Sequence, residues 1–271
     1  MVKSQLMATE DIISDEVWAL VPARSGSKGI VDKNMQEIQR VSLLGLSVLA
    51  GTNSSSIDRC FVSTDSALYA DEARRYGAEV PFLRPGAAAT ASATDLDVFQ
   101  HFLNWAAENV DYLPRAIVHL RPTTPCREPD RVNEAVKLAR EMTPSITAMR
   151  SVHLAPESPF KWFLRDSAGY LTTFDRGREL DESNRSRAEF EDVFIPNGYV
   201  DVVFPSQIIT TGLLHGNAVL PFVTEPIIEV DGPFELELLR RADSVPKTLL
   251  TAAAVARGVH TSDLERETAP E

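Results

Sequence analysis

The sequence predicts an α/β fold in which a mostly parallel β-sheet carries helices on both faces. Short β-branched segments alternate with longer segments of helical periodicity, which is the pattern of successive βαβ units. The chain has 271 residues and a hydrophobic fraction of 44%, enough to build one sizeable core. Neither an internal repeat nor a low-complexity tract is visible, so one principal domain is expected.

The expected strands are short apolar runs that span 17–23, 59–65, 79–84, 115–122, 145–152, 197–205, 218–224 and 227–231. A helix is expected over 67–76, because Ser66 can accept hydrogen bonds from its first turn and Gly77 can end it. Another should follow Glu128 and Pro129, where apolar residues recur at helical spacing at Val132, Ala135, Val136 and Ala139. Two further helical stretches are expected in the last part of the chain.

The segment 156–196 interrupts this alternation. It is rich in charged, aromatic and turn residues and has no long helical period, so it is expected to be an insertion built from hairpins. The core is then expected to comprise 16–155 and 197–260. The ends, 1–15 and 261–271, are polar and lack periodicity, which predicts flexible termini.

Composition argues against several classes of protein. The net charge of −12 argues against a nucleic-acid-binding surface, because phosphate contacts need clustered lysine and arginine. No apolar run approaches the ~18 residues that a membrane span needs, and acids occupy the amino-terminal segment where a signal peptide would be apolar. The two cysteines, Cys60 and Cys126, are isolated, which favours structural roles in a reducing compartment. We therefore expect a cytoplasmic protein without nucleic-acid or membrane partners.

The segment VPARSGSKGIVDKN, from Val21 to Asn34, is the strongest local signal for a ligand site. A glycine-containing loop at the carboxyl end of a strand lets backbone amides surround phosphate, and Arg24, Lys28 and Lys33 supply positive charge. The spacing matches neither the P-loop nor the GxGxxG dinucleotide motif. The segment predicts a nucleoside triphosphate site, with an exposed basic loop that binds nothing as the alternative.

Glu229 and Asp231 are candidate metal ligands, because alternate residues of a strand point to the same side. Mg²⁺ prefers carboxylate, water and phosphate oxygens, and a reaction at a triphosphate needs such an ion. The alternative is a solvated strand end. The histidines lack the HxxxH spacing of a metal site, so no histidine ligand is expected.

Several segments then occur in an order that resembles the N-acylneuraminate (CMP-sialic acid) cytidylyltransferases: VPARSGSKGIVDKN, FVSTD, GAEVPFLRP, LRPTTPCR and PNG. The resemblance runs from Trp18 to Arg241. It implies a Rossmann-like nucleotidyltransferase core, with 156–196 as a dimerisation and acceptor-binding insertion, and a homodimer whose partner reaches into the active site. It also implies Mg²⁺-dependent transfer of CMP from CTP to the anomeric hydroxyl of a nonulosonic 2-keto-3-deoxy sugar acid, with release of pyrophosphate.

The resemblance also implies roles for individual residues. Arg24, Lys33 and Asp231 become the catalytic residues, and Asp231 with Glu229 holds the metal, although the family has Asp where this chain has Glu229. The nucleotide-binding residues are Ala23, Arg24, Ser25, Gly26, Lys28, Lys33, Asn34, Arg84 and Asp95. Neither a nucleophilic residue nor a general base is assigned.

On the acceptor side, Lys161 and Arg187 correspond to residues that bind the carboxylate of the sugar, supplied by the partner subunit. An arginine fork suits a carboxylate, although both side chains are also compatible with ordinary surface charges. The full set of acceptor residues is Arg121, Thr123, Lys161, Arg187, Asn197 and Gly198.

Three departures from the family pattern concern specificity. Arg121 stands in RPTTP where the family usually has the glutamine of QPTSP, and this added cation favours a more anionic acceptor. Ala188 removes a second amide after Arg187. Near the base pocket, Ala91 replaces an acid, and Asp95 can accept from the amino group of cytosine or from the two donors of guanine.

These departures leave two alternatives beside the CTP-dependent synthesis of a nonulosonic acid conjugate. One is a CTP- or GTP-dependent nucleotidyltransferase that acts on a sugar phosphate or phosphonate. The other is a catalytically silent nucleotide-binding protein, suggested by Glu229 and the lost amides.

Overall fold

A six-stranded sheet forms the centre of the structure, a computed structural model that describes residues 13–27, 29–86, 93–141 and 145–265. Its strands, in chain order, are β1 (Val17–Pro22), β4 (Arg59–Ser63), β5 (Ala116–His119), β6 (Ala148–Leu154), β9 (Phe194–Val203) and β10 (Val219–Val223). Their spatial order is β10-β6-β9-β5-β1-β4. Within this described sheet β9 runs antiparallel to both neighbours and the other pairs are parallel. The predicted mostly parallel sheet is therefore confirmed.

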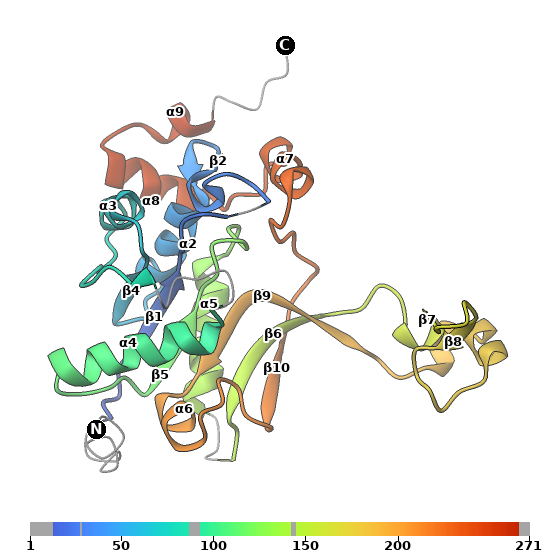
Figure 1. The fold of residues 1–271 in the computed structure, drawn as a ribbon. Coiled ribbons are helices and arrows are strands. Elements are labelled where there is room, and N and C mark those ends of the chain that lie inside the picture. Colours follow the sequence, from blue (N-terminus) through green and yellow to red (C-terminus); the bar gives the residue numbers. More distant parts are fainter. Residues whose placement is uncertain (1–12, 28, 87–92, 142–144, 266–271) are drawn as a thin grey trace.

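Helices cover both faces of the sheet (Figure 1). The larger core lies between one face and the helices α2 (Leu43–Thr52), α3 (Ala67–Arg75), α5 (Pro129–Glu141), α7 (Pro233–Arg241), α8 (Lys247–Arg257) and α9 (Thr261–Glu265). The smaller core lies under α4 (Asp95–Asn109) and α6 (Pro205–Thr211). Along β1, Val17, Ala19 and Val21 belong to the larger core, whereas Trp18 and Leu20 belong to the smaller one. Burial on both faces is typical of a central parallel strand.

The two helices delimited from the sequence begin where their capping chemistry predicts. The Ser66 side chain accepts a hydrogen bond from the Tyr69 amide at 3.4 Å at the start of α3, and Gly77 adopts a left-handed φ of 90° after its end. Helix α5 begins at Pro129 and ends at Glu141. These helices lie on the larger core and support the loops at the carboxyl ends of β4 and β5.

The strand predicted at 79–84 is wrong. This segment forms only an isolated bridge between Glu79 and Phe61 of β4. Pro81 has no amide hydrogen with which to continue the ladder, so the pairing stops after one residue. The apolar side chains of this segment therefore reflect packing at the sheet edge rather than strand formation.

The strand predicted at 227–231 is also wrong. The segment is extended but forms no regular strand. The amide of Val230 donates instead to the Thr123 carbonyl at 2.7 Å. A contact with a loop, rather than with the sheet, therefore fixes the position of the two acids that flank Val230.

The chain between β6 and β9 forms an arm that extends away from the core (Figure 1). The arm contains one antiparallel hairpin, made of β7 (Phe163–Arg165) and β8 (Leu171–Thr173). Short 3-10 helices occupy Pro159–Lys161, Leu180–Asn184 and Arg187–Glu189. One hairpin with helical turns, rather than several hairpins, thus builds the predicted insertion. Because β9 begins at Phe194, the boundary predicted at 196 falls within a strand.

The carboxyl-terminal end is more ordered than its polar sequence predicts, because α9 buries Leu264 against the larger core. Residues 1–12 and 266–271 lie outside the described residues. Cys60 and Cys126 form no disulfide in the described chain. None of the helices that the structure describes combines the length and the apolar character needed to cross a bilayer.

Candidate functional site

The loop after β1 is anchored at its start by Asp65, which follows β4. The Ser25 amide and hydroxyl donate to the two carboxylate oxygens of Asp65 at 2.7 and 2.8 Å. Burial disfavours the charged form of Asp65, but the hydrogen bonds from Ser25 outweigh it and lower the pKa of this carboxyl. Gly26 has a φ of 69°, a left-handed conformation that suits glycine. Asp65 is a site residue that the sequence analysis missed, although it ends the motif FVSTD.

The second half of the loop folds back on the first. The buried Asn34 side chain donates to the Arg24 carbonyl at 3.1 Å. Asp32 has a left-handed φ of 47° and accepts a hydrogen bond from the Tyr69 hydroxyl at 3.1 Å. The 3-10 helix Lys33–Met35 and the two-stranded ribbon of β2 (Glu37–Ile38) and β3 (Val41–Ser42) follow it. Arg24 itself forms no ion pair with any described residue. One loop therefore carries the predicted nucleotide residues Ala23, Arg24, Ser25, Gly26, Lys33 and Asn34, whereas Lys28 lies outside the described residues.

Lys33 connects this loop to the acidic segment near the carboxyl end. Its Nζ donates to the Val230 carbonyl at 2.8 Å, across 197 positions of sequence, and lies 3.9 Å from Asp231 Oδ1. Gly29 lies at the same junction, because a Cβ there would be 3.2 Å from the Asp231 carbonyl oxygen. The structure thus brings the predicted phosphate loop and the predicted metal segment together.

The donor set at this junction suits a magnesium ion. The Asp231 side chain is 80% exposed, and Glu229 Oε1 accepts a hydrogen bond from the Thr123 hydroxyl at 2.9 Å. Mg²⁺ is commonly held by one or two carboxylates together with water and substrate phosphate. Across the described ranges, no group of three or more His, Cys, Asp or Glu residues could hold a metal by itself. An ion bound here would therefore take further oxygens from the substrate and solvent.

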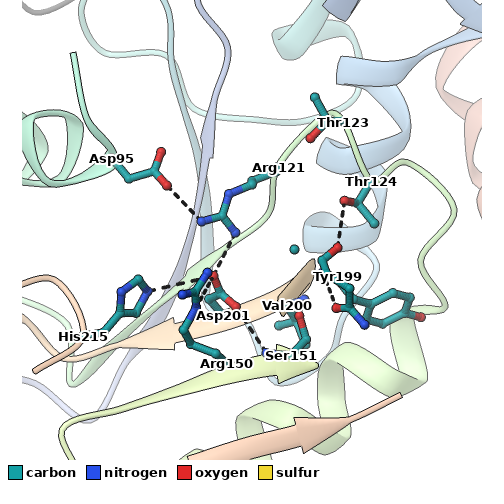
Figure 2. Close-up of polar contacts among 12 residues, drawn as sticks. Asp95, Arg121, Thr123, Thr124, Arg150, Ser151, Tyr199, Val200, Asp201 and His215 are labelled. Carbon is teal, nitrogen blue, oxygen red and sulfur yellow. Dashed lines mark hydrogen bonds and ion pairs between the residues drawn. The ribbon is translucent and has the colours of Figure 1, made fainter. Parts of the chain in front are cut away.

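Arg121, expected to add positive charge to the acceptor site, is paired with two carboxylates (Figure 2). Its Nη1 lies 2.8 Å from Asp201 Oδ2 and its Nη2 lies 2.9 Å from Asp95 Oδ2. Asp201 lies on β9 with a fully buried side chain, and nitrogens of Arg150 and His215 are 3.6 and 3.9 Å from the same oxygen. Burial opposes ionisation of Asp201, but the charge and hydrogen bond of Arg121 together with neighbouring groups that include Arg150 outweigh it, so the pKa of Asp201 is lowered. The charge of Arg121 is therefore balanced within the protein, which removes the argument for a more anionic acceptor.

The two side chains expected near the nucleotide base occupy different surroundings. Asp95, the first residue of α4, is 41% exposed and forms an ion pair with Arg121, a residue predicted for the acceptor. Arg84 is buried, and its guanidinium donates to the Ser63 carbonyl at 3.2 Å at the end of β4. Burial lowers the pKa of Arg84. Ala91, the neighbouring departure from the family pattern, lies outside the described residues.

The regular pairing of β9 with β6 is interrupted between Pro196 and Asp201, and the bulged stretch there, which forms a turn within the strand, packs with Asn197 and Gly198 against the loop that follows β5. The Thr124 hydroxyl donates to the Asn197 carbonyl at 3.4 Å, and the Asn197 amide donates to the Thr224 hydroxyl at 2.7 Å. Gly198 has a φ of 64°, and a Cβ there would lie 3.3 Å from Thr124 Oγ1 and 3.5 Å from Arg121 Cδ. The close approach expected for this glycine is therefore made with the protein's own loop.

Lys161 and Arg187 lie on the arm and apart from this junction. Arg187 donates to the carbonyls of Pro156 and Ala155 at 2.6 and 2.8 Å, where the arm leaves the core. Neither side chain makes a hydrogen bond or ion pair with the core site residues of the described chain. Within one subunit the structure therefore does not bring these two residues to the other candidates.

Three buried polar groups around the site were not selected from the sequence. Asp201 had a signal, because a single acid within the apolar run 199–203 needs a buried partner. His119 at the end of β5 is fully buried, and neither ring nitrogen has a hydrogen-bond partner among the described residues. Burial lowers the pKa of His119 to about 3. Arg127 is also fully buried, and nothing in the motif LRPTTPCR indicates this.

The arrangement suits a transfer reaction driven by positioning. Cations and loop amides lie beside two carboxylates, and Thr123 joins that segment to the loop that follows β5. Such a site can hold a charged phosphate chain and a second substrate side by side. In the described residues the junction contains no serine or cysteine nucleophile paired with a histidine base, so direct attack by the second substrate fits this arrangement best.

Comparisons with known proteins identify relatives. A family model described as cytidylyltransferase matches residues 18–161. A CMP-N,N'-diacetyllegionaminic acid synthase from Legionella pneumophila is 27% identical over 233 residues, which cover 83% of this chain and 95% of that protein. An N-acylneuraminate cytidylyltransferase from Escherichia coli is 29% identical over 225 residues, which cover 82% of this chain and 51% of that protein. The match therefore spans nearly all of the first relative and about half of the second.

Solved structures share the fold. A CMP:2-keto-3-deoxy-manno-octonic acid synthetase complexed with CTP superposes with a TM-score of 0.59 at 13% identity, covering 83% of this chain and 97% of that chain. A 4-diphosphocytidyl-2C-methyl-D-erythritol synthase from Anaerococcus prevotii gives a TM-score of 0.56 at 11% identity, covering 83% of this chain and 95% of that chain. At these identities the likeness concerns the architecture, and it confirms the predicted Rossmann-like α/β core.

Proposed function

Since the family model covers more than half of its 271 residues, the chain belongs to the cytidylyltransferase family, and we propose that it transfers CMP from CTP to the anomeric hydroxyl of a nonulosonic, sialic-acid-like sugar acid, with release of pyrophosphate. The observation that carries this proposal is the junction at which Lys33 contacts Val230 and Asp231. It joins a cationic loop, a carboxylate pair and the loop after β5 at one place. The names of the relatives from Legionella and Escherichia coli support the choice of acceptor.

In the proposed reaction the loop after β1 binds the triphosphate. Arg24 is free of acidic partners in the described chain, so its charge is available to the phosphates, and Lys33 adds a second cation from the same loop. Asp231 and Glu229 would hold Mg²⁺, which when bound reduces the charge repulsion between the phosphates and the attacking hydroxyl. Lys33 keeps the Asp231 segment against the loop, so that both reach the same phosphates.

The acceptor is proposed to lie over the loop after β5 and the turn at Asn197 and Gly198. Thr123 lies on this loop and contacts Glu229, so an acceptor hydroxyl held there would be next to the metal position. Arg121, fixed by Asp201 and Asp95, would shape this surface without adding net charge. The hypothesis of a phosphate or phosphonate acceptor depended on that charge and has no separate support.

We further propose that the arm, predicted as the 156–196 insertion, pairs two subunits and lets the partner's copy supply Lys161 and Arg187. The exposed apolar side chains on the arm support this, because they would be covered by a second copy. They are Trp162, Phe163, Tyr170, Leu171, Phe174 and Leu180, each at least 42% exposed. A mixed dimer of an Arg187 variant and an Asp231 variant would regain part of the activity if one active site uses residues from both subunits.

Pyrophosphate release tests the proposed function directly. CTP, GTP, UTP and ATP are each incubated with Mg²⁺ and with nonulosonic acids, sugar 1-phosphates or small phosphonates. We expect release only with CTP and a nonulosonic acid, and chelation with EDTA should abolish it. Release only with a phosphorylated acceptor would contradict the proposed acceptor, and CTP binding without turnover on any acceptor would contradict the proposed activity.

A further inference from the structure

Arg127 is a buried cation held by neutral oxygens. Its guanidinium is fully buried and donates to the carbonyls of Tyr199, Arg121 and Gly198, the last two at 2.7 and 3.0 Å, and to the Ser47 hydroxyl at 3.0 Å. In the described chain no carboxylate forms an ion pair with it. Burial lowers the pKa of Arg127 to about 9. A buried charge without a counter-ion is costly, so its hydrogen bonds must offset a large desolvation penalty.

These hydrogen bonds connect two segments that are distant in sequence. The Arg121 carbonyl belongs to the loop after β5, whereas the Gly198 and Tyr199 carbonyls belong to the turn on β9, 71 and 72 positions from Arg127. Other links join the loop after β5 to β9: the Thr124 hydroxyl donates to the Asn197 carbonyl, the Glu128 amide donates to the Tyr199 hydroxyl, and Arg121 pairs with Asp201. Arg127 differs from these because its one planar group binds backbone carbonyls of both segments.

The chemistry explains why an arginine is used. A guanidinium presents five donors in a fixed plane, so a single side chain can bind several carbonyls and set the distance between them. A lysine offers one rotatable ammonium and cannot hold the same geometry. An apolar residue of similar size would leave the carbonyls of Arg121, Gly198 and Tyr199 without this donor.

We propose that Arg127 is a positioning residue for the acceptor, which fixes the loop 121–125 against the turn 197–199 so that the two segments act as one acceptor surface. The proposal rests on the proposed function only for the identity of the substrate. Arg127 does not touch the loop 23–34, so its effect should fall on the acceptor and not on the nucleotide. A purely structural residue would instead weaken both substrates together or lower stability alone.

The kinetic test compares Arg127→Lys with Arg131→Lys, which removes a guanidinium from an exposed position of α5. In Arg127→Lys the KM for the nonulosonic acid should rise about tenfold or more, while the KM for CTP stays within about twofold. Arg131→Lys should change neither KM. An equal rise of both KM values, or an unchanged acceptor KM in a folded variant, would overturn the proposal.

A second measurement does not depend on activity. Amide hydrogen exchange in Arg127→Lys should accelerate together in peptides that cover 121–127 and 197–201 and stay unchanged in 17–25. Acceleration in one of the two segments alone would refute the link between them. If the wild type turns over no acid acceptor, the proposed function fails, but this exchange result still decides the role of Arg127.

A variant that leaves Arg127 in place covers the case in which Arg127→Lys does not fold. Thr124→Val removes the hydroxyl that donates to the Asn197 carbonyl across the same junction. It should raise the acceptor KM by a smaller factor, about threefold, with the CTP KM unchanged. An unchanged acceptor KM in Thr124→Val would count against the proposal.

Discussion

The proposed nucleotide side and the proposed acceptor side of the site differ in how their charges are paired. On the proposed nucleotide side, made of the loop 23–34 and the segment 229–231, Arg24 has no acidic partner among the described residues and Asp231 is 80% exposed. On the proposed acceptor side, made of 121–127 and 197–201, Arg127 and Asp201 are buried, and Arg121 and Arg127 are bound to other groups of the protein.

This difference indicates different tasks. A triphosphate and its metal bring several charges with them, so the groups that receive them must remain available. A sugar is recognised mainly by shape and hydrogen bonds, which requires a surface that is already rigid when the sugar arrives. The ion pairs of Asp201 on the proposed acceptor side would supply that rigidity.

The largest effect is expected for Asp201→Asn on the acceptor side. This change leaves Arg121 and Arg150 without the buried carboxylate between them, which should lower the free energy of unfolding by about 3–5 kcal/mol. Urea denaturation measures this change in the free energy of unfolding. The double variant Arg121→Gln/Asp201→Asn should lose less stability than Asp201→Asn, because it leaves no unpaired charge at the Arg121–Asp201 pair. A loss below about 1 kcal/mol in Asp201→Asn would mean that the ion pair is not formed.

On the nucleotide side, Asp231→Ala should leave stability nearly unchanged and lower kcat by about 10²–10³-fold, because an exposed carboxylate contributes to the reaction rather than to the fold. Pyrophosphate release and thermal denaturation of the same sample separate the two effects. Glu237→Ala on α7, which removes another exposed acid, is the matched control and should retain full activity. Full activity in Asp231→Ala would remove the metal assignment.

His119 should make the acceptor side sensitive to acid. Its folded pKa of about 3 lies below the ordinary value of 6.5, so the unfolded state takes up the proton first as the pH falls. The stability contribution of the neutral ring is therefore complete above pH 6.5 and is lost as the pH falls toward 3. At pH 5 the loss should be about 2 kcal/mol, since each pH unit changes the free energy by about 1.4 kcal/mol.

His119→Leu removes that titrating group. Its unfolding free energy should decline less than that of the wild type between pH 7 and pH 5, as measured by urea denaturation at each pH. Parallel declines in the two proteins would show that His119 does not stay neutral in the folded state.

The smallest effect is expected for Ser25→Ala on the nucleotide side. It removes the hydroxyl bond to Asp65 but keeps the amide bond to the same carboxylate. The KM for CTP should rise about fivefold, the effect of one hydrogen bond of about 1 kcal/mol, and the acceptor KM should stay constant. A change in the acceptor KM alone would contradict the division of the site into two sides.

Sequence reasoning worked where local chemistry decides the structure. Ser66 and Gly77 delimit α3 by their own capping preferences, and the loop after β1 could be recognised because glycine and basic residues follow an apolar strand. It failed at 79–84, where Pro81 stops the pairing with β4 after one residue, and at 227–231, where the Val230 amide donates to a loop carbonyl instead of a strand. At 227–231 the partner is Thr123, which the segment's own sequence does not contain.

The partners of the buried charges were beyond prediction for the same reason. In the sequence Arg121 is an additional cation, whereas in the fold it is paired with Asp201, 80 positions away. Arg127 donates to backbone carbonyl oxygens. Every residue carries such an oxygen, so the sequence does not indicate which of them Arg127 binds. No local sequence preference, comparable to that of a helix-capping residue, indicates hydrogen bonds to carbonyls. Only the folded chain therefore shows that Arg127 is buried.

Strand β9 contains both the end of the arm and the acceptor turn. Its pairing with β6 is regular from Phe194 to Pro196 and resumes at Asp201, but between them five steps along β9 oppose two steps along β6. Gly198, at a φ of 64°, lies in this bulge. Because a bulge interrupts the alternation of side chains, the register at the base of the arm is separate from the register that points Asp201 at Arg121. The arm can therefore change in length by a residue without reversing the face on which Asp201 lies.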